Sequence, residues 1–337
     1  MDLASTLAER RLLPDSLIRY GIRKQLATHS QWLEKNPRST ESWIEALNNR
    51  PIAESIEKSK EQHYEVPTEY FQLALGTHLK YSCCLWNKGV RSLTDAEAAS
   101  LKLTCERAQV KDGQSILELG CGWGSLSLWM AEHYPRSTIT AMSHSKTQKA
   151  WIEAQAKSRN LGNLTVITSD INDFKTEQRF DRILSLEMFE HLRNHQKIFE
   201  ALNTWLKADG KVFIHVFVHK KETYLFEVEH KRDWMAKYFF TGGIMPSLDL
   251  LPKSASAFTE EERWLVNGNH YSKTLEAWLE KQDANERQIL KHFKATYGKD
   301  APLWIQRWRI FYMACSELFA FKDGNEWFVT HYRFSKQ

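Results

Sequence analysis

The sequence predicts an α/β fold in which a doubly wound, mostly parallel sheet of seven strands is covered by helices on both faces. From Gln114 onward, short apolar runs rich in Ile, Val, Leu and Phe alternate with longer segments of helical spacing. This alternation is typical of strand–helix–strand units, whose parallel strands are buried on both sides. Five runs are expected to form the parallel part of the sheet: 115–119, 137–142, 164–168, 180–186 and 211–218.

The segments between these runs predict the helices that cover the sheet. Apolar residues recur at helical spacing over 125–133, 146–159 and 189–206. We expect the last of these helices to end at the stretch that contains Gly210, because glycine commonly follows a helix C-terminus.

The C-terminal part of the chain predicts the remaining two strands. Apolar runs near 264–266 and over 326–334 are expected to add antiparallel strands to one edge of the sheet, which is common on otherwise parallel sheets. Helical spacing begins at about residue 274 and again over 303–321.

The chain is expected to divide into an N-terminal helical region, residues 1–60, and one large α/β domain, residues 61–337. Residues 220–270 break the strand–helix alternation with a charged segment and the turn-rich stretch 239–246. We expect this insertion to cover a site above the sheet.

Composition excludes several classes of protein. The 337 residues include 46 basic and 42 acidic side chains, for a net charge of +4, with no long run of one sign; this argues against a nucleic-acid partner. The sequence contains neither the roughly 18 consecutive apolar residues of a membrane span nor the apolar N-terminal core of a secretory signal. The five cysteines form no Cys-x-x-Cys pair, which predicts reduced thiols in the cytoplasm and no metal site.

A glycine-rich turn, E-L-G-C-G-W-G-S, follows the first predicted strand and opens a helix. Gly120, Gly122 and Gly124 allow a sharp turn and a close approach of the backbone to a ligand. Their GxGxG spacing differs from the GxGxxG of a dinucleotide-binding turn and from a phosphate-binding loop. Glu118, just before the first glycine, suits a cationic ligand that carries an amino acid. A turn without a ligand is the alternative, but three alternating glycines are costly to order.

This turn resembles the motif of class I S-adenosylmethionine-dependent methyltransferases. The resemblance implies that S-adenosyl-L-methionine binds against Glu118 and the three glycines and leaves as S-adenosyl-L-homocysteine. The family places an acid after the third strand, near the adenine, and Asp170 stands there with its neighbour Ile171.

The end of the second predicted strand departs from the common pattern of that family. Most members have an acid there for the ribose hydroxyls, whereas this chain has Ser143, His144, Ser145 and then Gln148. The departure resembles the branch that contains cyclopropane fatty acid synthases and coclaurine-type N-methyltransferases. It implies that Ser143, Ser145 and Gln148 contact the cofactor.

Three ionisable residues follow the fourth predicted strand, within S-L-E-M-F-E-H. If a helix begins near Glu187, then Glu190 and His191 share its face with Glu187, at the strand end where open sheets bind ligands. A histidine between two carboxylates is a candidate base, and methyl transfer to an alkyl amine needs one because an amine with a pKa of about 10 is mostly protonated at neutral pH. An ordinary helical ion pair is the alternative, but the position beside the glycine turn favours catalysis.

The resemblance extends from about residue 60 to the C-terminus. Y-S-C-C-L-W at 81–86, F-F-T-G-G-I-M-P-S at 239–247 and W-L-V-N-G-N-H-Y-S-K-T at 264–274 are similar to the coclaurine N-methyltransferase branch. The resemblance implies that Tyr81 and Ser82 help to close over the cofactor.

The same resemblance implies the residues of the methyl-acceptor site. Glu187, Glu190 and His191 would line it, and Tyr271 would reach the active centre. Weaker candidates for the pocket wall are aromatic: Phe239, Phe240, Trp308, Phe311 and Trp327.

Two activities are compatible with this site. The resemblance implies N-methylation of a small, cyclic or aromatic alkylamine of the benzylisoquinoline type. The rival is methyl transfer to an unsaturated lipid, as in cyclopropane fatty acid synthases, which use bound bicarbonate. The synthases share Glu190 and His191, but their motif looks like S-x-G-x-F-E-H, with glycine where this chain has Glu187. A carboxylate at this position would repel an anion and therefore favours the amine. Cys83 and Tyr271, however, match the synthase pattern.

A third hypothesis is a non-catalytic S-adenosylmethionine-binding protein. It is less favoured because the Glu-Glu-His group is intact. The oligomeric state stays open, a homodimer included.

Overall fold

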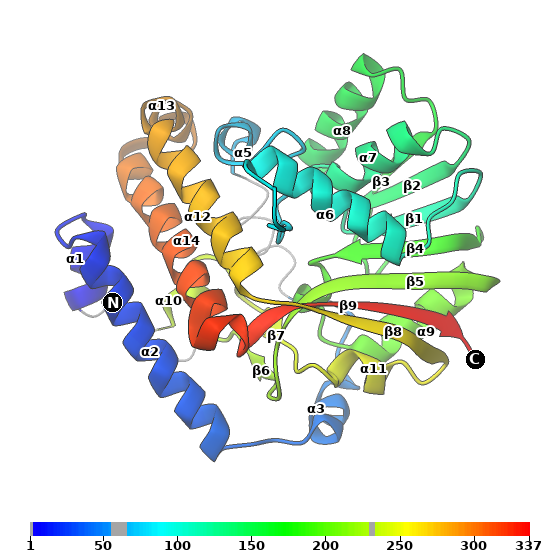
Figure 1. Cartoon of the computed structure of the whole chain (residues 1–337), viewed down its shortest axis with the longest axis horizontal. Coiled ribbons are helices and arrows are strands. Elements are labelled where there is room, and N and C mark those ends of the chain that lie inside the picture. The colour runs from blue at the N-terminus through cyan, green and yellow to red at the C-terminus, as the bar shows by residue number, and fades with distance from the viewer. Residues whose placement is uncertain (1–2, 55–65, 229–232) are drawn as a thin grey trace.

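The computed structural model describes residues 3–54, 66–228 and 233–337. Its centre is a seven-stranded sheet with the strand order β3-β2-β1-β4-β5-β9-β8 (Figure 1). Strands β1 to β5 run parallel, and β9 pairs antiparallel with both β5 and β8, which confirms the predicted fold class. The strands are β1 (Ser115–Leu119), β2 (Thr138–Ser143), β3 (Leu164–Thr168), β4 (Phe180–Leu186), β5 (Leu206–His219), β8 (Phe258–Val266) and β9 (Trp327–Lys336).

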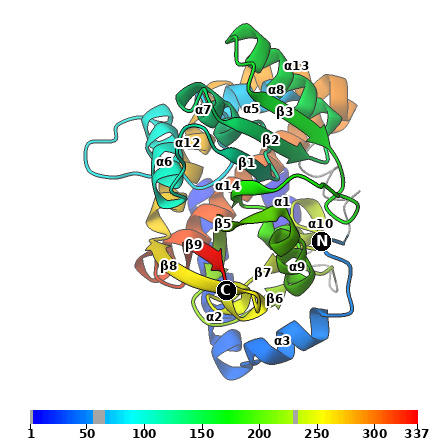
Figure 2. The same cartoon turned by 90° about the vertical axis from the view of Figure 1, so that its right-hand side faces the viewer.

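Helices cover both faces of the sheet, which is why the central strands are continuous apolar runs (Figure 2). Helices α6 (Leu93–Arg107) and α7 (Ser125–His133) pack with Ile116 of β1 on one face, and α9 (His195–Trp205) packs with Leu117 and Leu119 on the other. Helix α8 (Lys146–Ser158) packs with β2 and β3. The glycine turn between β1 and α7 is thereby fixed at the carboxyl end of β1, which lies between β2 and β4.

The predictions for the segment after β4 are partly wrong. The expected helix over 189–206 is a single turn of 3₁₀ helix, η2 (Phe189–His191), followed by α9. Asn194 starts α9 because its side chain accepts a 3.0 Å hydrogen bond from the backbone N–H of Lys197. Gly210 ends no helix, since α9 stops at Trp205 and Gly210 lies inside β5.

The N-terminal helices share one layer with the C-terminal helices. Arg19 of α2 (Asp15–Lys35) forms ion pairs with Glu276 and Glu317, on α12 (Asn269–Ala284) and α14 (Ala301–Gly324). The first part of the helical region expected over 1–60 is therefore packed onto the end of the chain, and the predicted boundary at residue 60 lies outside the described residues. The other helices of this layer are α1 (Leu3–Glu9), α5 (Thr68–Ala74), α13 (Glu286–Tyr297) and the 3₁₀ turn η3 (Gly298–Asp300). Helix α3 (Thr40–Leu47) instead packs beside the sheet, where Leu47 belongs to the same apolar cluster as Leu117.

The segment expected as a cap over 220–270 lies only partly outside the main sheet. Its first part forms a two-stranded sheet and two short helices: β6 (Tyr224–Leu225), α10 (Trp234–Tyr238), β7 (Ile244–Met245) and α11 (Leu250–Ser254). The last part, β8, is an edge strand of the main sheet. Of the helices in the described part of the chain, none has the length and apolarity that crossing a bilayer requires.

Candidate active site

The glycine turn leaves no room for larger residues at two of its positions. Gly120 has φ +73°, and a Cβ there would lie 2.8 Å from the Cβ of Met188. Gly124 has φ +80°, and its Cβ would lie 2.6 Å from Ile152 in α8. Gly122, with φ +53°, has open space beside it and lines the cavity. All three conformations favour glycine, because L-residues with a side chain rarely adopt positive φ.

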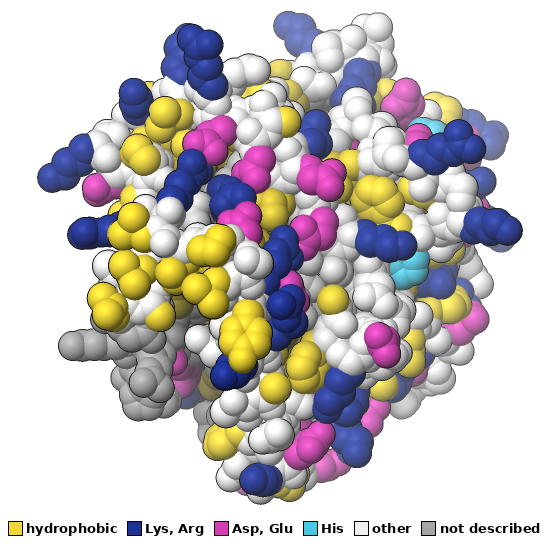
Figure 3. Space-filling model, turned by 60° about the vertical axis from the view of Figure 1, so that its left-hand side comes forward, with side chains coloured by type: hydrophobic (Ala, Val, Ile, Leu, Met, Phe, Trp, Pro, Cys, Tyr) yellow, Lys and Arg dark blue, Asp and Glu magenta, His cyan; other side chains and the backbone are white. Residues whose placement is uncertain are grey.

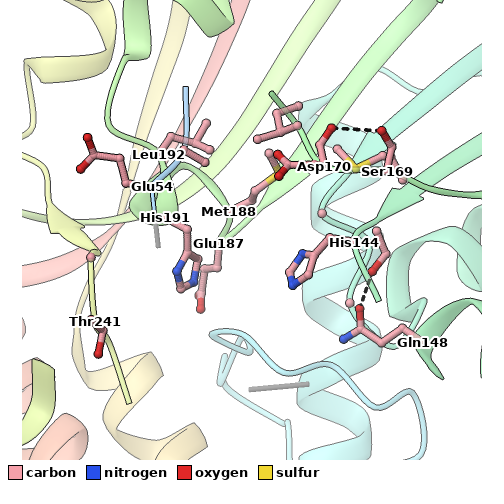
Figure 4. A pocket seen from close by; sticks show the side chains of 17 residues that line it. Glu54, His144, Gln148, Ser169, Asp170, Glu187, Met188, His191, Leu192 and Thr241 are labelled. Carbon is pink, nitrogen blue, oxygen red and sulfur yellow. Dashed lines mark hydrogen bonds between the residues drawn. The ribbon is translucent and has the colours of Figure 1, made fainter. Parts of the chain in front are cut away.

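Two adjoining pockets open beside this turn. A pocket of about 710 Å³ contains Ser143, Asp170 and Ile171 in its wall (Figure 4). A second, of about 1200 Å³, includes Tyr81, Ser82 and Glu118. The two pockets share five residues and form one continuous site: Gly120, Gly122, Gln148, Glu187 and His191.

Two predicted cofactor residues do not line either pocket. Gly124 is the N-cap of α7 and packs against α8. Ser145 is buried and caps α8, where its Oγ accepts from the backbone N–H of Gln148 at 3.2 Å. Ser143 donates from its Oγ to Oε1 of Gln148 at 2.6 Å. The two serines and Gln148 therefore form one hydrogen-bonded network at the end of β2, in which Ser145 fixes the backbone of Gln148 without lining the pocket.

Glu118 is a buried carboxyl at the end of β1. Its exposed fraction is 2%, and the Ser127 hydroxyl donates a hydrogen bond to it. Burial raises the pKa of Glu118 to about 8, against the hydrogen bond from Ser127, because a charged carboxylate is costly to desolvate. A cationic group placed beside it in the pocket would favour its ionised form.

Glu187 does not begin a helix. Its φ is +49°, and the side chain turns into the cavity, where three donors meet it. Oε1 accepts from the backbone N–H of Cys83 at 2.8 Å and from Nε2 of His215 at 3.0 Å, and Oε2 accepts from the hydroxyl of Tyr271 at 2.5 Å. These partners come from three distant segments, and together they hold the strained backbone in place.

The pKa of Glu187 is set by opposing effects. Burial raises it, and the charge of Lys80 and the hydrogen bonds from Tyr271 and Cys83 lower it, with a raised pKa as the result. Lys80 is fully buried nearby, where its ammonium donates to the Ser82 hydroxyl and the Cys83 carbonyl, both at 2.6 Å.

The structure does not bring Glu190 into the cavity, so the expected common face of three side chains is wrong. Glu190 is completely buried, and its Oε1 accepts from the backbone N–H of Phe217 at 2.9 Å. Burial, and then the neighbouring charge of Glu187, raise its pKa well above the usual range. His191 lies in both pocket walls with its ring centroid 4.8 Å from that of Phe240.

The second pocket is strongly apolar on the side away from the glycine turn. Tyr271, Phe240 and Phe311 line it as predicted. Among its other wall residues are seven that sequence reasoning missed: Phe217, Phe226, Met235, Met245, Trp278, Leu318 and Phe319. Scattered single Met and Phe residues carry no motif, so sequence reasoning found this wall only near 239–246 and at Tyr271 and Phe311.

Three predicted aromatic residues stand behind the wall or away from it. Phe239 and Trp308 are fully buried and pack on Phe311, with ring centroids 4.5 Å and 5.6 Å away. Trp327 is buried at the start of β9 beside His219, 5.3 Å between ring centroids. Phe239 and Trp308 therefore support wall residues from behind: both pack on Phe311, and Trp308 also lies near Tyr81.

Comparisons with known proteins identify the family of this chain. A sequence profile described as mycolic acid cyclopropane synthetase matches residues 53–327. The (S)-coclaurine N-methyltransferases of Thalictrum flavum subsp. glaucum and Papaver somniferum are 35% and 34% identical over 98% of this chain, and 94% and 96% of their own lengths are covered. This chain belongs to the mycolic acid cyclopropane synthetase family.

Solved structures and a lipid enzyme place the chain within this family. A crystal structure of coclaurine N-methyltransferase bound to N-methylheliamine and SAH has a TM-score of 0.94 and 33% identity, and 98% of each chain is covered. The cyclopropane-fatty-acyl-phospholipid synthase of Escherichia coli K12 is 30% identical over 81% of this chain and 67% of its own. The chain is an S-adenosylmethionine-dependent methyltransferase, and the comparisons favour the N-methyltransferases of the family over its lipid synthases.

The site fits S-adenosyl-L-methionine. The turn at Gly120 and Gly122 leaves its backbone open to the cavity, and the Ser143–Gln148 pair faces the same space. Asp170 stands after β3, where the family resemblance expects a contact to the adenine.

Proposed function

We propose that the protein transfers a methyl group from S-adenosyl-L-methionine to the nitrogen of a small, cyclic or aromatic alkylamine of the benzylisoquinoline type. The observation that carries the proposal is the position of Glu187. Its carboxylate lies where the two pockets meet, between the glycine turn and an aromatic cavity. The relative whose crystal structure contains N-methylheliamine supports this class of acceptor.

The cofactor would be held by the glycine turn and the network at the end of β2. Ser143 and Gln148 would contact the ribose and Asp170 and Ile171 the adenine, as lining residues of the first pocket, and Tyr81 and Ser82 would close over the cofactor from the second. When bound, the cofactor supplies a methyl group on a sulfonium, which is already a good electrophile. The protein must therefore mainly present a nitrogen lone pair in line with it.

The acceptor cavity suits an aromatic amine. Rings of Phe240, Phe311 and Tyr271 offer flat apolar surfaces, and aromatic faces also attract a cation. Glu187 supplies a negative charge beside these aromatic rings, which draws a protonated amine to the junction of the pockets.

His191 is the proposed base. The oxygens of Glu187 already accept three hydrogen bonds from the protein, so Glu187 acts best by attracting and orienting the amine. His191 lines both pockets and can take the proton from the ammonium. Glu190 would have an indirect role: it accepts a hydrogen bond from the backbone N–H of Phe217 and so fixes this residue of the pocket wall.

The donors around Glu187 argue against the lipid reaction. A synthase of this family needs bound bicarbonate, and an anion needs hydrogen-bond donors. Here the Tyr271 hydroxyl, the Cys83 N–H and His215 Nε2 all point to the carboxylate of Glu187. A second anion would meet the repulsion of that carboxylate at the same place.

Several further expectations belong to this proposal. Within the cap expected over 220–270, Phe226, Met235, Phe240 and Met245 line the second pocket, and these described residues would cover the acceptor. The partner would be a small molecule and not a nucleic acid; on the face in Figure 3, basic and acidic side chains are interspersed. The enzyme would work in the cytoplasm, as a monomer or homodimer.

A labelled-methyl assay tests the proposal. Purified protein is incubated with methyl-labelled S-adenosyl-L-methionine and, in separate reactions, a benzyl-substituted tetrahydroisoquinoline, an aryl-ethylamine and vesicles of an unsaturated phospholipid. Label in the tetrahydroisoquinoline supports the proposal. Label in the lipid alone overturns it.

A further inference from the structure

A chain of buried side chains connects Glu187 to a residue outside the cavity. His215 on β5 places its Nε2 3.0 Å from Oε1 of Glu187, and its Nδ1 lies 2.9 Å from Nε2 of His331 on the neighbouring strand β9. The Nδ1 of His331 lies 2.8 Å from NH1 of Arg107, in the last turn of α6. Both histidines are buried, with exposed fractions of 1% and 3%.

The arginine end fixes the direction of every hydrogen bond in this chain. A guanidinium carries only donors and stays protonated in proteins, so Nδ1 of His331 must accept from Arg107. Burial lowers the pKa of both histidines well below the usual range, and a neutral imidazole has one donor and one acceptor. His331 must then donate from Nε2 to Nδ1 of His215, and His215 must donate from its Nε2 to Glu187.

We propose that Arg107, His331 and His215 are positioning residues that lock both histidines as Nε2–H tautomers and so present Glu187 to the acceptor as an oriented carboxylate. Each bond in the chain is polarised by the next, so the charge of Arg107 reinforces the donor at Glu187. This role rests on the proposed function, in which the carboxylate attracts and orients the amine.

The same direction excludes the chain as an exit for the amine proton. To pass a proton outward from Glu187, His215 would have to accept at Nε2, which already carries a proton, and Arg107 would have to accept at the far end. The proton must therefore leave on the cavity side, where His191 stands.

Other ionisable groups lie around this chain of hydrogen bonds and contribute to its electrostatic environment. None of them is substituted in the variants compared below. Around Glu187 they come from the 80–83 loop, η2, α12 and α14, and around Arg107 from β8. They are Lys80, Cys83, Glu190, His191, Tyr271, Cys315 and Glu262.

Nitrogen-15 NMR of the histidine side chains tests the tautomers without any substrate. Protein labelled with nitrogen-15 histidine is measured at neutral pH, and signals are assigned with the single variants His215→Gln and His331→Gln. We expect both residues to show a protonated Nε2 and an unprotonated Nδ1. A protonated Nδ1 on either residue overturns the proposal, whatever the acceptor of the enzyme proves to be.

The kinetic test compares three variants at the outer end of the chain. Arg107→Met removes the donor and keeps much of the side-chain bulk, and Arg107→Lys restores a donor. Arg333→Met is the control for the surroundings of Arg107: Arg333 stacks on the same indole ring of Trp264 (5.3 Å, against 4.9 Å for Arg107) and donates to the backbone carbonyl of Arg107 at 2.9 Å, but it is not a member of the hydrogen-bonded chain.

The readout is kcat/KM across pH with the amine accepted by the wild type. Loss of the polarising charge makes Glu187 easier to protonate, so Arg107→Met is expected to move the acidic limb to higher pH and to lower kcat/KM at neutral pH by about tenfold. Arg107→Lys should recover most of the loss, and Arg333→Met should keep the wild-type profile. A wild-type profile in Arg107→Met, or the same shift in Arg333→Met, contradicts the proposal. Transfer to no amine at all would instead contradict the proposed function and leave the NMR test in force.

Discussion

The hydroxyl group of Tyr271 donates a 2.5 Å hydrogen bond to Oε2 of Glu187, 84 positions earlier in the chain. The bond joins α12, in the helical layer, to the carboxyl end of β4, beside the glycine turn. The backbone of Glu187 has a positive φ, which is unfavourable for a residue with a side chain. This bond and those from Cys83 and His215 stabilise that conformation and keep the carboxylate at the junction of the two pockets.

Removing this hydroxyl should impair transfer without unfolding the protein. In Tyr271→Phe the ring can keep its stacking on Phe319, 4.4 Å between centroids. One hydrogen bond to a charged group is worth roughly 1.5–3 kcal/mol, so we expect kcat/KM to fall by about tenfold or more. Tyr312→Phe is the control, since that hydroxyl pairs with Tyr70 in the helical core and outside the pocket walls; equal losses in the two variants would show that the effect is structural.

Substitution of the two cavity residues that handle the amine should lower turnover strongly. His191→Ala removes the proposed base, and Glu187→Gln removes the charge that attracts the ammonium; each is expected to lower kcat by about 10²-fold. Binding of S-adenosyl-L-homocysteine, measured by calorimetry, should change little in His191→Ala. Wild-type turnover in His191→Ala would contradict the assignment of that residue as base.

A methyl group at Gly120 should weaken cofactor binding, because it would displace Met188, which lines the same pocket. Its Cβ would lie 2.8 Å from Met188, and φ is +73°. Gly113→Ala is the control: φ is +91° there, with nothing within 4 Å of the added Cβ, so that it carries the backbone cost of about 1 kcal/mol alone. We expect S-adenosyl-L-homocysteine to bind Gly120→Ala at least about tenfold more weakly and Gly113→Ala as tightly as wild type. Equal affinities in both variants would contradict the role of the turn.

The buried Glu118 predicts how the stability of the cofactor-free protein depends on pH. Its pKa rises from an ordinary 4.5 to about 8 on folding, so between these values the folded state holds a proton that the unfolded state has lost. The free energy of unfolding therefore falls as pH rises through this range. Glu118→Gln should flatten that slope and raise the melting temperature at pH 8 by a few degrees relative to wild type. A steeper slope in the variant would contradict the raised pKa.

The sheet and the glycine turn could be predicted because their signals are local in the sequence. The runs at 115–119, 164–168 and 180–186 match β1, β3 and β4 at both ends, since each is a largely apolar run flanked by polar residues or glycine. The turn could be located from the alternating glycines directly after β1.

The conformation at Glu187 could not be predicted in this way. Local spacing favoured a helix, but hydrogen bonds from Cys83, His215 and Tyr271, between 28 and 104 positions away, stabilise a positive φ instead. The same limit applies to the aromatic residues. Phe311 and Trp308 belong to the same helix, α14, but Phe311 lines the cavity and Trp308 is buried in the core. Which of the two rings lines the cavity depends on how the helix packs, and local sequence does not show this.

The most direct test of the account is the position of the transferred methyl group. With carbon-13 methyl S-adenosyl-L-methionine and a benzyl-substituted tetrahydroisoquinoline, the product is examined by two-dimensional NMR. The account predicts that the labelled methyl correlates with the ring carbons next to nitrogen and that Glu187→Gln forms far less of this product. A methyl group found on carbon or oxygen, or label recovered only as the methylene of a cyclopropane in added phospholipid, would contradict it.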